Sequence, residues 1–229
     1  MFIGHFGIGF GAKRVAPNVS LGTLFIAAQF LDLLWPTLLL LDLEQVRIVP
    51  GATTVTPLIF ENYPISHSLI AVLGWSVLIG GIHYLLRRKK VAALVLGFLV
   101  LSHWLLDAIV HSPDLPLIIG SSMRIGLNVW SSLPLTVLIE GSVFALGVWL
   151  YIRATYARNA RGSWGFWLLV AFLALIYTGN LFGSPPPDAT AIAWVGQAQW
   201  LLVLWAYWID KNRSTTKHQW VPALAKETP

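Results

Sequence analysis

Several His and Asp residues lie inside strongly apolar stretches of this chain, where ionisable side chains are rare. The most concentrated stretch is 102–111, in which His103, Asp107 and His111 are spaced four residues apart. Residues at this spacing stack along one face of an α-helix, and two such side chains can share one metal ion. Because the rest of the stretch is apolar, this polar face must point into the protein.

Other ionisable residues are embedded in the same way. His5 lies in a glycine-rich segment, Asp32 interrupts the apolar run 25–41, His67 stands between two serines, and Glu140 lies within a later apolar run. A charged side chain near the centre of a bilayer costs about 3 kcal/mol or more, so each is a candidate functional residue. For an ionisable residue that stands alone, the alternative to a functional role is a structural one, in which the side chain is hydrogen-bonded between helices.

The chemistry that these residue types favour is metal binding. The chain has no cysteine, which excludes thiolate sites, and imidazole with carboxylate suits Zn²⁺ best, with Mn²⁺ or Fe²⁺ as alternatives. A bound zinc ion lowers the pKa of water to about 7, and Asp107 or Glu140 could then act as general base. A proton relay or a structural polar network is the competing interpretation. The predicted metal ligands are His5, Asp32, His67, His103, Asp107 and His111.

The composition shows what kind of protein must position these residues. Of 229 residues, 56% are hydrophobic and 11% are charged, and the mean hydropathy is +0.70. Soluble domains carry about 25% charged residues, so the chain is predicted to be an integral membrane protein. Its net charge of +5 is better explained by membrane topology and anionic lipid headgroups than by nucleic acid.

A membrane-spanning helix needs about 20 mostly apolar residues. The segments that qualify are 20–42, 66–86, 91–111, 133–152, 164–183 and 190–209. Between them, Lys and Arg gather in alternate loops and in the C-terminal tail. The positive-inside rule therefore predicts a multi-pass protein of a bacterial-type inner membrane with a cytoplasmic C-terminus.

The segment 1–16 is too short to span and is rich in glycine. We expect it to be a re-entrant helix packed beside the first span, the alternative being a helix that lies on the membrane surface. With a turn near residues 18 and 19, His5 and Asp32 each lie about 20 Å from that turn, at 1.5 Å per residue. His103 lies at a similar distance from Lys90, so the three residues are predicted to meet at one depth.

The predicted fold is thus all-α, a polytopic membrane bundle of six transmembrane helices plus a short re-entrant N-terminal helix. We divide it into a metal-site half, 1–132, a scaffold of three helices, 133–210, and a polar cytoplasmic tail, 211–229. The expected partners are membrane lipids and a lipid-soluble or small-molecule substrate, and no nucleic acid.

These motifs resemble the YdjM-like family of LexA-binding, inner-membrane-associated metal-dependent hydrolases. The resemblance rests on His5, on Asp32 within Leu-Asp-Leu-Leu-Trp-Pro, on Ser-His-Ser around His67, and on Ser-His-x-x-x-Asp from residue 102 to residue 107. It covers about the first half of the chain. The chain departs from the family pattern at two places. Asp32 alone stands where the family has an Asp-x-Asp-His cluster, and Tyr63-Pro64 stands where the family has His-Arg.

The resemblance implies a helical bundle with a metal site and a hydrolase activity. The function expected from the sequence is therefore hydrolysis of a lipid-soluble or periplasmic ester or phosphoester. One alternative is a transporter of metal ions or protons that uses the same residues. A non-catalytic structural membrane protein is another.

Overall fold

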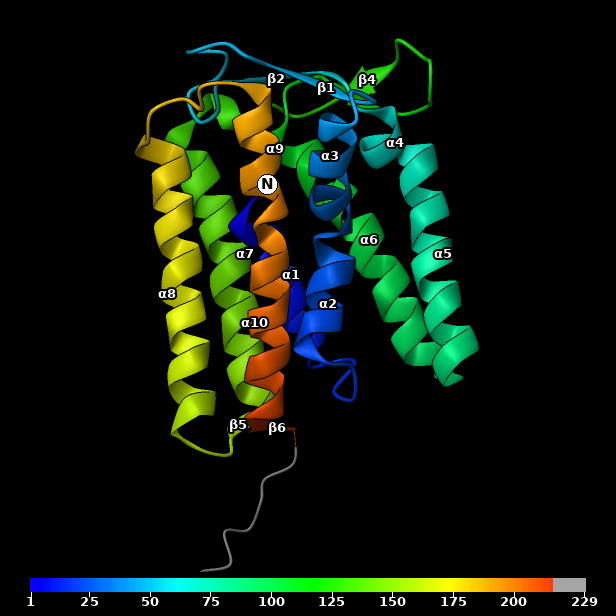
Figure 1. The fold of residues 1–229 in the computed structure, drawn as a ribbon, viewed down its shortest axis with the longest axis vertical. Helices are drawn as coiled ribbons and strands as arrows, with labels where there is room; N and C mark the ends of the chain where they lie inside the picture. The colour runs from blue at the N-terminus through cyan, green and yellow to red at the C-terminus, as the bar shows by residue number, and fades with distance from the viewer. Residues whose placement is uncertain (216–229) are drawn as a thin grey trace, which may run out of the picture.

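The computed structural model describes residues 1–215, and α-helices dominate them (Figure 1). The helices run roughly side by side along the long axis of the molecule, and short strands cap both ends. The predicted tail, 211–229, lies outside the described residues from residue 216 onward. The predicted all-α bundle is confirmed.

Five helices are long and apolar enough to cross a membrane, and a bent pair of shorter helices makes a sixth if the two together form one span. The five are α5 (Leu69–Arg87), α6 (Lys90–Val110), α7 (Leu133–Ala154), α8 (Ala160–Phe182) and the segment Ala189–Lys211, which contains α9 (Ala189–Gln197) and α10 (Gln199–Lys211). Each follows a predicted segment closely. The chain is therefore a multi-pass membrane protein.

The bent pair comprises α2 (Leu21–Ala28) and α3 (Phe30–Leu40), whose axes differ by 59°. The sequence predicts one continuous span over this region, and the structure breaks it at Gln29. Ser20 caps the first turn of α2 by accepting a hydrogen bond from the Thr23 N–H. The break leaves the end of α2 and the start of α3 deep in the bundle, so backbone carbonyl groups at the break can meet side chains from other helices.

The first helix, α1 (Ile3–Ala12), starts inside the bundle, and its first residues are buried. It lies against α7 at very short range because both helices carry glycine at the contact. A Cβ atom at Gly7 would lie 2.7 Å from Phe144 Cα, and one at Gly147 would lie 1.9 Å from the Gly7 carbonyl oxygen. Small residues permit such close approach between membrane helices. The short, buried helix fits the predicted re-entrant segment.

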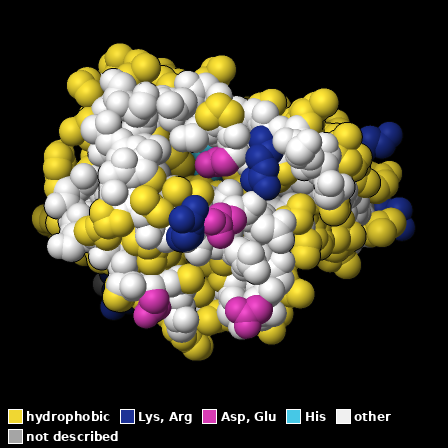
Figure 2. All heavy atoms as spheres, turned by 90° about the horizontal axis from the view of Figure 1, so that it is seen from above, with side chains coloured by type: hydrophobic (Ala, Val, Ile, Leu, Met, Phe, Trp, Pro, Cys, Tyr) yellow, Lys and Arg dark blue, Asp and Glu magenta, His cyan; other side chains and the backbone are white. Residues whose placement is uncertain are grey.

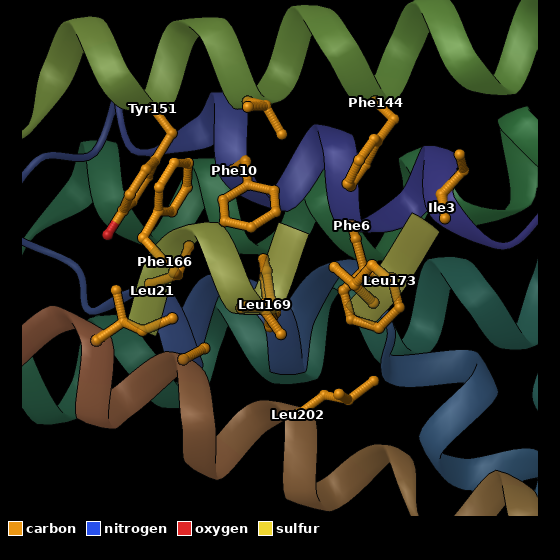
Figure 3. Packing of buried hydrophobic residues seen from close by; sticks show 14 of the residues in the cluster. Ile3, Phe6, Phe10, Leu21, Phe144, Tyr151, Phe166, Leu169, Leu173 and Leu202 are labelled. Carbon is orange, nitrogen blue, oxygen red and sulfur yellow. The ribbon is translucent and has the colours of Figure 1, made fainter. Parts of the chain in front are cut away.

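A largely aromatic core joins α1 to α7, α8 and α10 (Figure 3). Phe10 lies at its centre, with edge-to-face ring contacts to Phe25, Phe144, Tyr151 and Phe166. The core therefore contains side chains from both halves of the chain as the sequence divides it. It fixes the position of α1, and with it the position of His5.

Short elements cover the end of the bundle shown at the top of Figure 1. They are a hairpin of β1 (Gln45–Ile48) with β2 (Leu58–Asn62), the helical turn α4 (Pro64–His67), the pair β3 (Leu115–Pro116) and β4 (Arg124–Ile125), and the 3₁₀ turn η1 (Val129–Ser131). At the opposite end, β5 (Tyr156–Ala157) pairs with β6 (Arg213–Ser214). We call these the hairpin end and the Arg213 end.

Candidate metal centre

Five of the predicted ligands come together below the hairpin end. They come from four separate helices: His5 from α1, Asp32 from α3, His67 from α4, and both His103 and Asp107 from α6. All are buried except Asp32, which is partly exposed. Their atoms form two overlapping groups that could hold a metal ion, one of His5, His103 and Asp107, and one of Asp32, His67 and His103.

Two imidazoles and two carboxylates face one another most closely. His103 Nε2 lies 3.2 Å from Asp107 Oδ2 and 3.6 Å from Asp32 Oδ1. His67 Nε2 lies 3.7 Å from Asp32 Oδ1 and 3.8 Å from Asp107 Oδ2. Neighbouring ligand atoms on a tetrahedral zinc ion are about 3.3 Å apart, given bonds of about 2.0–2.1 Å. The imidazole–carboxylate distances of 3.2–3.8 Å are close to this spacing.

The bend in the first span orients His103. The ring nitrogen Nδ1 of His103 lies 2.8 Å from the carbonyl oxygen of Ala28, the last residue of α2, and donates to it. With its proton on Nδ1, the ring presents a lone pair at Nε2. This Nε2 is buried and makes no hydrogen bond within the described residues, as expected of an atom that is available to bind a cation.

A hydrogen-bonded chain orients His67 in the same way. Ser66 Oγ donates to Glu44 Oε2 at 2.5 Å and lies 2.6 Å from His67 Nδ1, from which it accepts. Glu44 also accepts the backbone N–H groups of Ile65 and Ser66, at 2.7 and 2.8 Å, so it caps the start of α4. Trp104 donates to the His67 carbonyl oxygen at 2.9 Å. The lone pair of His67 Nε2 therefore faces the two carboxylates.

The two oxygens of Asp107 have different partners. Oδ2 faces His67 and His103, whereas Oδ1 lies 3.1 Å from His5 Nε2 and contacts the amino nitrogen of Met1. The His5 ring stacks on that of His103, with centroids 3.5 Å apart and planes 7° from parallel. His5 thus holds Asp107 in place and belongs to the ligand group of His5, His103 and Asp107.

His111 is the most peripheral of the predicted ligands. Its Nε2 lies 4.0 Å from Asp107 Oδ1, and its Nδ1 lies 2.9 Å from Asp114 Oδ1. The Tyr63 hydroxyl group donates to the same Asp114 oxygen at 2.8 Å. Burial, followed by the nearby Asp114 carboxylate, raises the pKa of Tyr63, so Tyr63 stays a protonated donor. These contacts hold His111 beside Asp107. It lies outside the group of four that face one another most closely, namely Asp32, His67, His103 and Asp107.

Glu140 was predicted as a second catalytic carboxylate, and the structure places it next to α1. It is buried and accepts the backbone N–H of Phe2 at 2.7 Å, which satisfies a donor at the start of that helix. Glu140 also lines the cleft that contains Asp107. Its catalytic role stays a prediction.

A cleft of about 650 Å³ contains the site residues Asp32, His67 and Asp107. Part of its lining comes from the loop 51–58 at the hairpin end, and part from the end of α8 and from α9. Seen from that end, Asp and Glu side chains lie near the middle of the face beside Lys or Arg, and others lie at its lower edge (Figure 2). The centre therefore has a path for a ligand.

Sequence reasoning missed several residues around the site. Glu44 was not singled out from the sequence, and neither were Trp35 and Tyr177, which both line the cleft. Ser66 stood out only as a neighbour of His67, whereas its hydroxyl group connects Glu44 to His67. The position of Trp35, three residues after Asp32 and thus on the same helical face, was a signal that could have found it.

The comparisons with known proteins add nothing to this geometry. The resemblance to the YdjM-like family therefore stays a prediction from the motifs. The geometry of the site is what indicates a function. Protein-family models, curated proteins and solved structures were all compared with the chain, and none matches it.

Proposed function

We propose that this protein is a membrane-bound, metal-dependent hydrolase whose ion is held by Asp32, His67, His103 and Asp107. One observation carries the proposal. Two buried imidazoles present Nε2 to the same two carboxylates, and each has its other nitrogen hydrogen-bonded to a fixed acceptor. Metal-binding histidines in proteins are oriented by such a bond at the second nitrogen.

The arrangement leaves four acceptor atoms facing one another. If both imidazoles are neutral, no proton lies between Nε2 of either ring and the carboxylate oxygens, and buried acceptors without donors are costly. A divalent cation satisfies all four at once. A proton on His103 is the other way to satisfy them, but His103 Nε2 makes no hydrogen bond despite lying 3.2 Å from Asp107 Oδ2. The ligand geometry thus favours the ion.

Nitrogen and oxygen ligands without sulfur suit zinc best, and manganese or iron next. Catalytic zinc sites commonly have three protein ligands and an open position, so either Asp107 would leave the ion or a fifth position would take the water. The ion would then polarise a carbonyl or phosphoryl oxygen and lower the pKa of that water. Asp107 and Glu140 line the cleft and are the candidate bases for the water proton. In the hydrolysis, the water oxygen bonds to the acyl carbon or phosphorus, the ester C–O or P–O bond breaks, and the leaving alcohol takes up a proton.

The membrane environment completes the proposal. We infer a bacterial-type inner membrane with the Arg213 end, and so the C-terminus, in the cytoplasm. The support is the asymmetry of the loops: Arg87, Arg88, Lys89 and Lys90 form the turn between α5 and α6, at the Arg213 end. The metal centre then lies in the outer half of the bilayer. The motif resemblance to the YdjM-like hydrolases agrees with this location.

The test uses purified protein loaded separately with zinc, manganese and iron. We expect hydrolysis of p-nitrophenyl laurate or bis-p-nitrophenyl phosphate, lost on chelation and in Asp107→Asn. His83→Ala serves as the matched control, because His83 lies on α5 near the Arg213 end and outside both ligand groups. Protein that binds an ion but cleaves neither substrate with any of the three metals would contradict a hydrolase.

The bend at Gln29 favours a second function, transport of metal ions or protons. Broken helices next to an intramembrane carboxylate form ion sites in many transporters, and Asp32 follows the 59° break by three residues. Transport predicts zinc or proton flux in proteoliposomes that Asp32→Asn abolishes. Metal binding with neither flux nor hydrolysis would leave a structural role.

A further inference from the structure

The cleft connects the metal centre to the side of the bundle that faces lipid. Beyond Asp32, His67 and Asp107, its lining continues along the end of α8, through 179–181, to Val195 of α9. Val195 is 73% exposed and lies within an apolar span. In a bilayer, this end of the cleft opens towards the acyl chains of the lipids.

The loop 51–58 covers the same cleft from the hairpin end. Thr54 Oγ1 donates to the carbonyl oxygen of Ser131 at 2.8 Å, and Val55 packs against the cluster of Val110, Val129 and Trp130. These contacts fix the loop to η1 and to the end of α6. The opening between α8 and α9 is therefore a route that a ligand dissolved in the membrane can use.

Two buried donors line the cleft without a partner. Trp35 and Tyr177 are each 8% exposed, and neither the Trp35 Nε1–H nor the Tyr177 hydroxyl group is hydrogen-bonded within the part of the chain that the structure describes. Buried polar groups are normally hydrogen-bonded. Two free donors in one cleft point to a ligand that brings acceptor oxygens.

The charges in the cleft decide what kind of head group fits. Among the described residues that line it, three are carboxylates (Asp32, Asp107 and Glu140) and none is Lys or Arg. A divalent ion would offset two of these charges, and the Met1 amino group, which contacts Asp107, at most one more. The cleft then holds no excess of positive charge that would attract a phosphate. An uncharged acceptor such as a carboxylic ester meets no such difficulty.

We propose that the substrate is an uncharged long-chain ester that enters the cleft from the membrane between α8 and α9. Its ester oxygens accept from Trp35 and Tyr177, and its chain lies along Leu181, Ile192 and Val195. The hydrolysis of this ester rests on the function proposed above, whereas its binding does not. The proposal selects carboxylic esters over phosphoesters as the substrate class.

The absence of cysteine allows a direct test of where the ester binds. Val195→Cys is alkylated with a maleimide in dodecyl maltoside, which carries no ester, with and without methyl laurate. Leu175→Cys is the matched control, because Leu175 is 68% exposed on α8 and lies outside the cleft lining. We expect methyl laurate to slow labelling at position 195 about three- to tenfold, since pockets bury about 70–90% of a ligand, and to leave position 175 unchanged.

Three comparison ligands show which part of methyl laurate the cleft recognises. Inorganic phosphate, dodecyl phosphate and dodecane are each expected to protect position 195 less than methyl laurate does. Equal or stronger protection by dodecyl phosphate or free phosphate would overturn the uncharged head group. Equal protection by dodecane would overturn recognition of the ester oxygens, and equal slowing at both cysteines would overturn the cleft itself.

The two donors are tested by removing one at a time. Trp35→Phe and Tyr177→Phe are each expected to weaken methyl laurate binding about three- to tenfold, the usual worth of one hydrogen bond. Tyr151→Phe, a buried tyrosine near the Arg213 end, is expected to change nothing. All binding is measured after chelation as well. Protection of position 195 with no hydrolysis by the metal-loaded protein would contradict the proposed function alone, whereas hydrolysis without protection would contradict the route.

Discussion

Two buried polar clusters lie at opposite ends of the bundle, and their hydrogen bonding differs. At the Arg213 end, each guanidinium nitrogen of Arg213 donates: Nε to Thr155 Oγ1, Nη1 to the Gly162 carbonyl oxygen and Nη2 to the Thr155 carbonyl oxygen. The guanidinium group also lies over the rings of Tyr151 and Phe166, 5.3 and 5.0 Å from their centroids. These bonds connect α7 and α8 to the end of α10.

Under the hairpin end, the buried polar atoms are arranged differently. His103 Nε2 and His5 Nδ1 have no hydrogen-bond partner among residues 1–215, and neither have Trp35 Nε1 and the Tyr177 hydroxyl group. The two imidazoles are nevertheless held through their other nitrogens, His103 Nδ1 by the Ala28 carbonyl oxygen and His5 Nε2 by Asp107 Oδ1. The Tyr151 hydroxyl group at the Arg213 end is also without a partner among the described residues, but the charged group there has each of its nitrogens bonded. Under the hairpin end, the ionisable imidazoles themselves have a free nitrogen, which a ligand can use.

The largest effect is expected when the central imidazole is removed. His103→Ala should weaken zinc binding more than about 100-fold, since even outer hydrogen-bonding partners of a metal ligand are worth about 10–100-fold. Zinc at about 100 times its Kd should stabilise the wild-type protein by about 2.7 kcal/mol and the variant by nearly nothing. Thermal unfolding with and without zinc measures both. Equal zinc stabilisation of wild type and variant would remove His103 from the site.

Arg213→Met tests the other cluster. It keeps an apolar stem of similar shape but leaves two buried carbonyl groups and one hydroxyl group without their donor, which should cost about 2 kcal/mol of unfolding free energy. Zinc affinity should not change, because the two clusters lie at opposite ends of the bundle. The measurement is the unfolding midpoint together with a zinc titration. A loss of zinc affinity would show that the clusters are coupled.

The two serines on either side of His67 allow a finer test at the hairpin end. Ser66→Ala removes the group between Glu44 and His67 and should weaken zinc binding at least about tenfold. Ser68→Ala removes a cap of α5, where Ser68 accepts the Ala71 N–H, and should cost about 1 kcal/mol of stability without changing zinc affinity. Isothermal titration of both variants separates the effects. If Ser66→Ala binds zinc like the wild type, the proposed orientation of His67 is wrong.

Tyr63→Phe should have the smallest effect. Losing the bond to Asp114 should cost about 1 kcal/mol, and zinc affinity should stay within a factor of about three because His111 stands outside the group of four. Since the folded pKa of Tyr63 is raised from 10.0, its contribution is fully present below pH 10 and is lost as the pH rises above it. Stability curves of both proteins from neutral to alkaline pH check this. A large loss of zinc affinity would place His111 in the centre.

Much of the architecture could be predicted because it depends on local properties of the chain. Span length follows from apolar runs, and the spacing of His103 and Asp107 puts both on one helical face whatever the rest of the fold does. The depth of His5 and Asp32 follows from counting residues from one turn. The structure brings these side chains together, with His5 stacked on His103 and Asp32 Oδ1 3.6 Å from His103 Nε2.

The parts that were missed depend on distant contacts. Gln29 is neither proline nor glycine, so nothing in the local sequence predicts the 59° bend that frees the Ala28 carbonyl oxygen for His103. Glu44 meets Ser66 across 22 residues. Tyr177 lies in an apolar run in which an aromatic residue facing the cleft and one facing lipid look alike. Only the packing of the helices distinguishes them.

The most direct test of the metal centre is elemental analysis of the full chain, purified without chelator and then incubated with zinc, followed by X-ray absorption spectroscopy at the zinc edge. We predict about one tightly bound ion per chain, with only nitrogen and oxygen ligands at about 2.0–2.2 Å and an imidazole signal from two histidines. Protein that retains no zinc, manganese or iron, or zinc whose spectrum shows no imidazole, would contradict the account.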